Sequence, residues 1–127
     1  IFNDRSLVEN KICSEKKVAL TVLATVVSTP TKNRAIIDAG SKVLTSDLFG
    51  MNDHGSIVNF PELRITQLTE EHGTIVSEQN TNLEIGQKIQ IIPNHACVVT
   101  NMLNEVNLIT EEKKLKKVKV VARGKVW

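Results

Sequence analysis

The residues of this chain best suited to chemistry are an imidazole and a thiol two positions apart, His95 and Cys97, just after the strand-like run Ile89 to Pro93. In an extended backbone, side chains at positions i and i+2 share one face, with Cα atoms ~6.5 Å apart. This spacing lets a ring nitrogen and a sulfur reach one metal ion at ~2.0 and ~2.3 Å. Two ligands cannot close a tetrahedral structural site, so a metal here would keep positions for water, substrate or other residues. The pair predicts an open half-site for a divalent metal.

The same two side chains allow other interpretations. A buried cysteine packs as a small hydrophobe, and a single histidine is often held by ordinary hydrogen bonds. A small thiol hydrolase is a further possibility, because the imidazole of His95 could activate the Cys97 thiolate as a nucleophile. No oxyanion-hole signature or orienting third residue accompanies the pair. Spacing alone leaves these alternatives open.

The composition of the 127 residues is that of an ordinary globular domain. Hydrophobic residues make up 41%, charged residues 24%, and the formal net charge is +2, which gives no global attraction to nucleic acid or membrane. Tyr is absent, so the apolar mass comes from Val, Ile and Leu, which favour strands. Two cysteines cannot build a disulfide-rich scaffold, and we expect a cytoplasmic protein. Because the chain begins at Ile1 rather than Met, we expect it to be part of a longer polypeptide.

Short apolar runs separated by turn residues predict the elements. Strands are expected over Val18–Ser28, Arg34–Gly40, Leu63–Leu68, Gly73–Ser77, Lys88–Ile92, Glu105–Thr110 and Leu115–Arg123. The first run is apolar on both faces, as in a strand buried on both sides. We expect a turn over 29–33, a loop with one helical turn over 41–55, and a turn or short helix over 94–103. The pattern predicts an all-β fold, a small Greek-key-like β-barrel or sandwich with short helical turns, forming one domain over 1–127.

The segment Lys113 to Lys125 holds seven basic residues and suggests a second type of function. A free-standing β-barrel binding module could bind nucleic acid through this hairpin. Such a surface usually also needs stacking aromatic side chains, of which the chain has few. Alternation over Lys117 to Val120 is typical of a half-exposed strand whose lysines discourage pairing with other chains. We therefore favour no nucleic-acid partner and keep this module as the alternative.

Six segments in order resemble one protein family: Phe2–Asp4, Ala19–Ser28, Arg34–Lys42 with Ser46 and Asp47, Leu68–Gly73, Ile92–Cys97 and Ala122–Lys125. Together they resemble the carboxy-terminal domain of the D-threonine aldolase and D-serine dehydratase family. These are metal-activated, pyridoxal phosphate-dependent lyases of the alanine racemase fold type. The resemblance covers nearly the whole chain and raises the metal interpretation of His95 and Cys97 above its alternatives.

The resemblance implies a two-domain, homodimeric parent enzyme that acts on small D-β-hydroxy amino acids. Its amino-terminal α/β barrel, absent from this chain, would carry the lysine that binds pyridoxal phosphate. The carboxy-terminal domain would supply the metal ligands, so we expect this chain alone to be inactive. No membrane partner is implied. The choice between the aldolase and the dehydratase reaction stays open.

The resemblance also implies the roles of individual residues. His95 and Cys97 would bind the metal beside the β-hydroxyl of the substrate, where a Lewis acid assists carbon–carbon cleavage or loss of water. A thiolate with an imidazole favours zinc, with manganese or magnesium as the options for an oxygen-rich site. Asp38, Ser41 and His72 lie in stretches that would face the active site, and we expect them as further catalytic candidates. Taken without the resemblance, these three positions are turn residues around Gly40 and Gly73.

Overall fold

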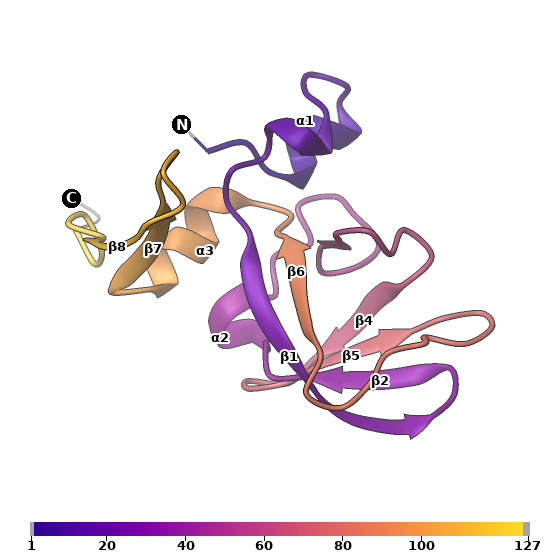
Figure 1. Cartoon of the computed structure of the whole chain (residues 1–127). Coiled ribbons are helices and arrows are strands. Elements are labelled where there is room, and N and C mark those ends of the chain that lie inside the picture. The colour runs from indigo at the N-terminus through magenta and orange to yellow at the C-terminus, as the bar shows by residue number, and fades with distance from the viewer. Residues whose placement is uncertain (1, 126–127) are drawn as a thin grey trace.

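The computed structural model describes residues 2–125, so the predicted 1–127 domain extends at both ends beyond the described residues, to Ile1, Val126 and Trp127 (Figure 1). The elements are α1 (Arg5–Glu9), the short 3-10 turn η1 (Glu15–Lys17), β1 (Val22–Thr31), β2 (Arg34–Ile37), α2 (Ser41–Leu44), β3 (Ser56–Ile57), β4 (Arg64–Leu68), β5 (Gly73–Val76), β6 (Lys88–Ile92), α3 (Ala96–Met102), β7 (Glu105–Ile109) and β8 (Leu115–Lys119). Strands dominate and the helices are short, so the predicted all-β class is confirmed.

Six strands form one antiparallel sheet in the order β3-β6-β1-β2-β5-β4. Strand β1 bends through two register shifts, so that its first half pairs with β6 and its second half with β2. The edge strands approach each other, and the backbone N–H of His54 donates to the carbonyl of Ile65 at 3.0 Å. The sheet is therefore a nearly closed barrel rather than a sandwich. Strands β7 and β8 form a separate hairpin.

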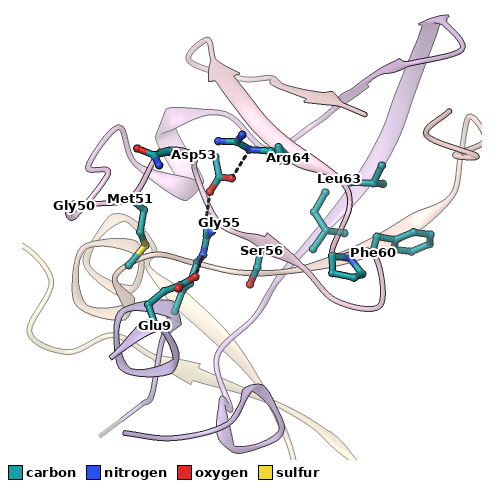
Figure 2. A pocket seen from close by; sticks show the side chains of 13 residues that line it. Glu9, Gly50, Met51, Asp53, Gly55, Ser56, Phe60, Leu63 and Arg64 are labelled. Atoms are coloured by element: carbon teal, nitrogen blue, oxygen red, sulfur yellow. Dashed lines mark hydrogen bonds and ion pairs between the residues drawn. The ribbon is translucent and has the colours of Figure 1, made fainter. Parts of the chain in front are cut away.

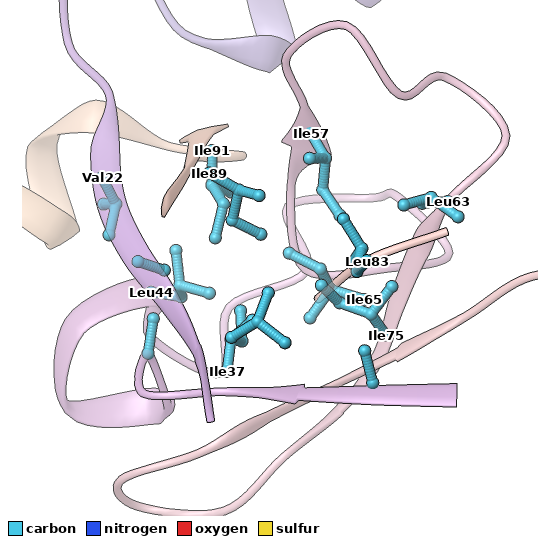
Figure 3. Close-up of a cluster of buried hydrophobic side chains, with 14 of the residues drawn as sticks. Val22, Ile37, Leu44, Ile57, Leu63, Ile65, Ile75, Leu83, Ile89 and Ile91 are labelled. Atoms are coloured by element: carbon cyan, nitrogen blue, oxygen red, sulfur yellow. The ribbon is translucent and has the colours of Figure 1, made fainter. Parts of the chain in front are cut away.

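Branched aliphatic side chains from most strands of the barrel fill its interior (Figure 3). Ile37, Ile65, Ile75 and Ile91 are fully buried. Along β1 burial alternates, as expected when one face of a strand meets the core. Leu23 is 66% exposed. The expectation of a strand buried on both faces is therefore wrong, because the barrel covers only its inner side.

Strand β1 also continues through Pro30 to Thr31, where a turn over 29–33 was expected. Pro30 lies beyond the register shift at Ser28, where the pairing with β2 is irregular. A proline is tolerated there because an irregular ladder makes less use of its missing N–H. The predicted turn is thus displaced toward Lys32 and Asn33.

Helix α2 lies against the turn that joins β4 to β5, and this contact depends on Gly40. The N–H groups of Ser41 and Lys42 donate to the carbonyls of Thr69 and Glu70 at 2.8 and 3.1 Å. A Cβ atom at Gly40 would lie 2.5 Å from backbone atoms of this turn. Only glycine lets the two backbones approach this closely.

A buried polar network fixes the other end of the barrel. The carboxylate of Asp53, which is 6% exposed, accepts hydrogen bonds from the guanidinium of Arg5 and from Nε of Arg64, the latter at 3.1 Å. The amide of Asn94 donates to the carbonyls of Asp53 and Leu48, at 2.7 and 3.2 Å. We call Arg5, Asp53, Arg64 and Asn94 the Asp53 network. It ties the first helix, the loop after α2 and the end of β6 to one another.

Asp4 extends this anchoring to helix α3. Its carboxylate is buried, accepts the hydroxyl of Ser6 at 2.5 Å, and accepts the backbone N–H of Ala96 at 2.8 Å. Ala96 is the first residue of α3, where backbone N–H groups lack partners within the helix. The start of α3 is therefore held in place by a residue more than ninety positions earlier in the chain.

We predict that Asp53→Ala lowers the free energy of unfolding by about 3 kcal/mol, because it removes the buried carboxylate partner of the largely buried Arg5 guanidinium and leaves that group only the exposed carboxylate of Glu9 as an ion-pair partner among residues 2–125. Urea denaturation followed by circular dichroism measures the change. Glu71→Ala is the control, since Glu71 pairs with Lys42 at an exposed position and its loss should change stability much less. Equal effects of the two substitutions would contradict the role given to the Asp53 network.

We predict that Gly40→Ala lowers the free energy of unfolding by about 2 kcal/mol, because the added methyl group displaces α2 from the 69–72 turn. The control is Gly86→Ala, where a Cβ meets no atom within 4 Å and only a positive φ of 88° opposes it, a cost of about 1 kcal/mol. Denaturant titration compares the two. A smaller effect at Gly40 than at Gly86 would show that the close approach has no energetic importance.

Candidate metal centre

His95 and Cys97 lie on either side of the start of helix α3. His95 is extended, with φ −139° and ψ 112°, whereas Ala96 and Cys97 already belong to the helix. The short helix expected within 94–103 is confirmed. The strand geometry that placed both side chains on one face is wrong, because it requires Ala96 to be extended as well. The metal-binding role of the pair stays a prediction.

The ring of His95 sits in a partly closed environment. Its side chain is 25% exposed, yet Nδ1 is buried and has no hydrogen-bond partner among residues 2–125. Oδ2 of Asp47 lies 3.8 Å from Nδ1. The ring of Phe49 packs on the imidazole, with centroids 4.3 Å apart and planes inclined by 31°. One edge of the imidazole thus faces the protein.

Cys97 is a free, exposed thiol on helix α3. It lines a surface hollow of about 360 Å³ together with Phe2, Ala96, Thr100, Asn101, Val120 and Ala122. Most of this lining is apolar, so the thiol lies at the border between a hydrophobic surface and solvent. Cys13, the other cysteine, is also free and is partly buried. Of the two cysteines, Cys97 is the one that follows a histidine by two positions in the sequence.

Within the described part of the chain, no group of three or more His, Cys, Asp and Glu side chains gathers where a metal ion could bind. An imidazole and a thiol are nonetheless a donor set that suits zinc. The buried Nδ1 of His95 also marks this ring as a polar group whose hydrogen-bonding capacity is unused. These two donor types would suit an open metal site, to which the described residues bring no third His, Cys, Asp or Glu side chain.

Asp38 lies just after β2 and is fastened to β1. Its carboxylate accepts the backbone N–H of Thr25 at 2.6 Å. Burial alone would raise the pKa of Asp38, but the hydrogen bonds from Thr25 and the charge of Lys88 outweigh this and lower it. The carboxylate is therefore anionic, and one of its oxygens is engaged in joining β2 to β1. In this position Asp38 acts as a structural link between β2 and β1.

Ser41 and His72 lie where the backbone around Gly40 closely approaches the 69–72 turn. Ser41 is the first residue of α2, and His72 donates its backbone N–H to Oγ1 of Thr69 at 3.0 Å. Helix α2 lies near α3 (Figure 1). Among residues 2–125, however, no hydrogen bond or ion pair joins Asp38, Ser41 or His72 to the two predicted ligands. Their catalytic roles stay predictions.

Asp47 and Phe49 were not expected beside the imidazole. They lie in the predicted loop of 41–55, which has a helical turn at its start and no regular structure from 45 to 55. Asp47 entered only as part of a segment of family resemblance. No spacing rule connects position 47 with position 95, so sequence pattern alone could not find this contact. A known barrel topology would have placed the loop near the end of β6.

A pocket of about 480 Å³ lies beside the Asp53 network (Figure 2). Figure 2 shows Arg64 reaching the Asp53 carboxylate, with Met51 and Glu9 lying farther from Arg64, at the left and lower left of the view. Both oxygens of Asp53 already accept arginine hydrogen bonds, so the charges at this pocket are internally compensated. Burial lowers the pKa of the neighbouring His54, and the negative charge of Asp53 offsets this only in part. We interpret this region as structural.

The β7–β8 hairpin carries the basic residues of the alternative function. Its strands are exposed on nearly all positions, and Glu105 and Glu112 lie 3.8 and 2.7 Å from Lys117 and Lys114. These carboxylates interrupt the positive surface.

Among residues 2–125, no helix is both long and apolar enough to cross a membrane.

Comparison with known proteins assigns the family. The family model described as "Putative serine dehydratase domain" matches residues 19–109. The chain is 34% identical over 131 residues to an uncharacterized protein of Mycobacterium tuberculosis, and 98% of each chain is covered. It is 32% identical over 128 residues to D-serine dehydratase of Dictyostelium discoideum, which covers 90% of this chain and 32% of that one.

Solved structures agree with the sequence matches. D-threonine aldolase from Filomicrobium marinum has a TM-score of 0.82 at 26% identity, covering 99% of this chain and 35% of that one. A histidine-to-alanine variant of D-threo-3-hydroxyaspartate dehydratase has a TM-score of 0.84 at 23% identity, covering 93% and 35%, a likeness that shows the fold alone. In a further variant of that dehydratase, in the metal-free form, alanine replaces a cysteine two positions after that histidine.

The chain spans nearly the full length of the mycobacterial relative, but only about a third of the D-serine dehydratase and of the solved enzymes. The matched range is more than half of the chain, and the expected resemblance is confirmed. The chain belongs to the serine dehydratase domain family, which forms the carboxy-terminal domain of D-serine dehydratase, D-threonine aldolase and D-threo-3-hydroxyaspartate dehydratase.

Proposed function

We propose that this chain is the metal-bearing domain of a pyridoxal phosphate-dependent lyase that acts on small D-β-hydroxy amino acids. The reaction would be of the D-serine dehydratase or D-threonine aldolase type. The observation that carries the proposal is the presence, in a member of this family, of the His95 imidazole two positions before the exposed thiol of Cys97. These side chains would be its two protein ligands to a divalent metal.

The variants of D-threo-3-hydroxyaspartate dehydratase support this assignment. Their histidine and cysteine are two positions apart, the same spacing as that of His95 and Cys97. The cysteine variant was obtained in a metal-free form. In our proposal, His95 and Cys97 are the residues through which this chain binds its metal.

We propose zinc as the metal, because a thiolate and an imidazole select it over manganese or magnesium. A bound zinc ion supplies Lewis acidity to the β-hydroxyl of the substrate. Cys97 must be deprotonated and His95 neutral to act as ligands. The ring of Phe49 covers part of the imidazole and limits the access of water to it. Asp38, Ser41 and His72 remain further catalytic candidates in this proposal.

The proposal also includes a partner. Related enzymes are about three times as long as the part that this chain matches. We propose that an amino-terminal α/β barrel of the same polypeptide carries the lysine that binds pyridoxal phosphate, that the full-length enzyme is a cytoplasmic homodimer, and that this chain alone is inactive.

We predict weak metal binding by the chain alone, with a dissociation constant above about 1 µM, because two ligands leave the ion mostly hydrated. Titration with cobalt(II) measures it through the absorption band of thiolate-bound cobalt. His95→Ala should weaken binding tenfold or more, and Cys97→Ser should remove the thiolate band. Cys13→Ser is the matched control and should retain both. A submicromolar constant abolished by His95→Ala would show that further ligands lie within this chain.

We predict that a polypeptide that joins this chain to its α/β barrel converts D-serine to pyruvate and ammonia or D-threonine to glycine and acetaldehyde. Assays of both substrates with pyridoxal phosphate decide the branch. A chelator should abolish turnover and added zinc should restore it, while Cys97→Ala should lower kcat a hundredfold or more. Full activity in the presence of chelator would refute the metal role.

A further inference from the structure

The loop over residues 45–50, here called the Asp47 loop, makes several contacts with the ring of His95 and the residue before it. Oδ2 of Asp47 lies 3.8 Å from Nδ1 of His95, and Phe49 packs on the ring. The amide of Asn94 donates to the carbonyl of Leu48 at 3.2 Å. The loop is thus attached to the residue that directly precedes His95 and meets the imidazole both at its edge and on its face.

Internal hydrogen bonds give the Asp47 loop its shape. Oδ1 of Asp47 accepts the backbone N–H of Phe49 at 2.9 Å, which leaves Oδ2 directed toward His95. Phe49 has φ +49°, a left-handed conformation that is unfavourable for a residue other than glycine. This backbone conformation accompanies the placement of the aromatic ring on the imidazole. One carboxylate therefore supports Phe49 and faces the histidine.

The chemistry of Nδ1 selects between the two neutral forms of the imidazole. Nδ1 is buried, and the single carboxylate within 4 Å of it, among residues 2–125, belongs to Asp47. The Asp47 side chain is 47% exposed, and a displacement of Oδ2 by about 1 Å would bring it within hydrogen-bond distance of Nδ1. A proton on Nδ1 donated to this carboxylate leaves the lone pair on Nε2.

We propose that Asp47 and Phe49 are positioning residues that hold His95 in the Nδ1–H form and orient Nε2 outward as the atom that binds the metal. This inference deepens the proposed function and rests on His95 being a ligand. A carboxylate that accepts the second N–H of a metal-binding histidine fixes the ring and increases its basicity as a ligand. Phe49 adds a wall on one face of the ring, which restricts its rotation.

The test measures the state of the ring without metal. Nitrogen-15 NMR of the histidine side chains, with the His95 signals assigned by their loss in His95→Gln, should show Nδ1 protonated and Nε2 unprotonated in the neutral ring. Asp47→Ala should shift the ring toward the opposite form, and Asp47→Asn, which keeps an oxygen acceptor, should retain most of the native signal. Glu78→Ala is the control, an exposed carboxylate in the loop after β5, and should change nothing.

Cobalt(II) titration of the same variants supplies the second readout. Asp47→Ala should weaken binding tenfold or more with its urea midpoint unchanged, and Phe49→Leu should weaken it less. A native ring protonated on Nε2, or an Asp47→Ala variant that keeps both its ring form and its affinity, would overturn the inference. Undiminished cobalt binding by His95→Ala would instead overturn the proposed function, and the NMR result would still decide whether Asp47 orients the ring.

Discussion

The buried carboxylate of Asp53 is the constraint on which the arrangement of the candidate site depends. An unpaired charge at this depth would be costly, so two arginines and the Asn94 amide converge on this residue. Their convergence joins α1, the loop after α2 and the end of β6. Because Asn94 precedes His95 and also contacts Leu48, the same network sets the position of the imidazole relative to the Asp47 loop.

The candidate site combines a rigid support with an open face. Asp4 fixes the first turn of α3, and the barrel core lies behind the end of β6. In contrast, Cys97 faces an apolar hollow at the surface. A domain built in this way would hold the proposed ligands on a stable frame and leave the remaining coordination positions of a metal to other groups. This combination of a rigid support and an open face is consistent with a chain that matches about one third of the length of its enzyme relatives.

Much of the fold could be predicted from local pattern, and the contacts of the site could not. The alternation and turn residues around Lys88–Ile92 and Gly73–Val76 are local signals, and those strands agree with expectation almost to the residue. Helix α1 was missed because its five residues are held by bonds to Pro93 and Asn94 rather than by a capping signal. The strand geometry assumed for His95 and Cys97 failed because the Asp4 carboxylate stabilises a helix start between them.

The shared strand β1 has a consequence for how the chain acquires its structure. Its first half pairs with β6, and Thr25 and Lys88 in this pairing are 63 positions apart. Closure of so long a segment costs entropy before any contact compensates for it, which slows folding. During synthesis the early strands therefore lack their neighbour until most of the polypeptide has left the ribosome. The barrel cannot close before β6 is available to pair with β1.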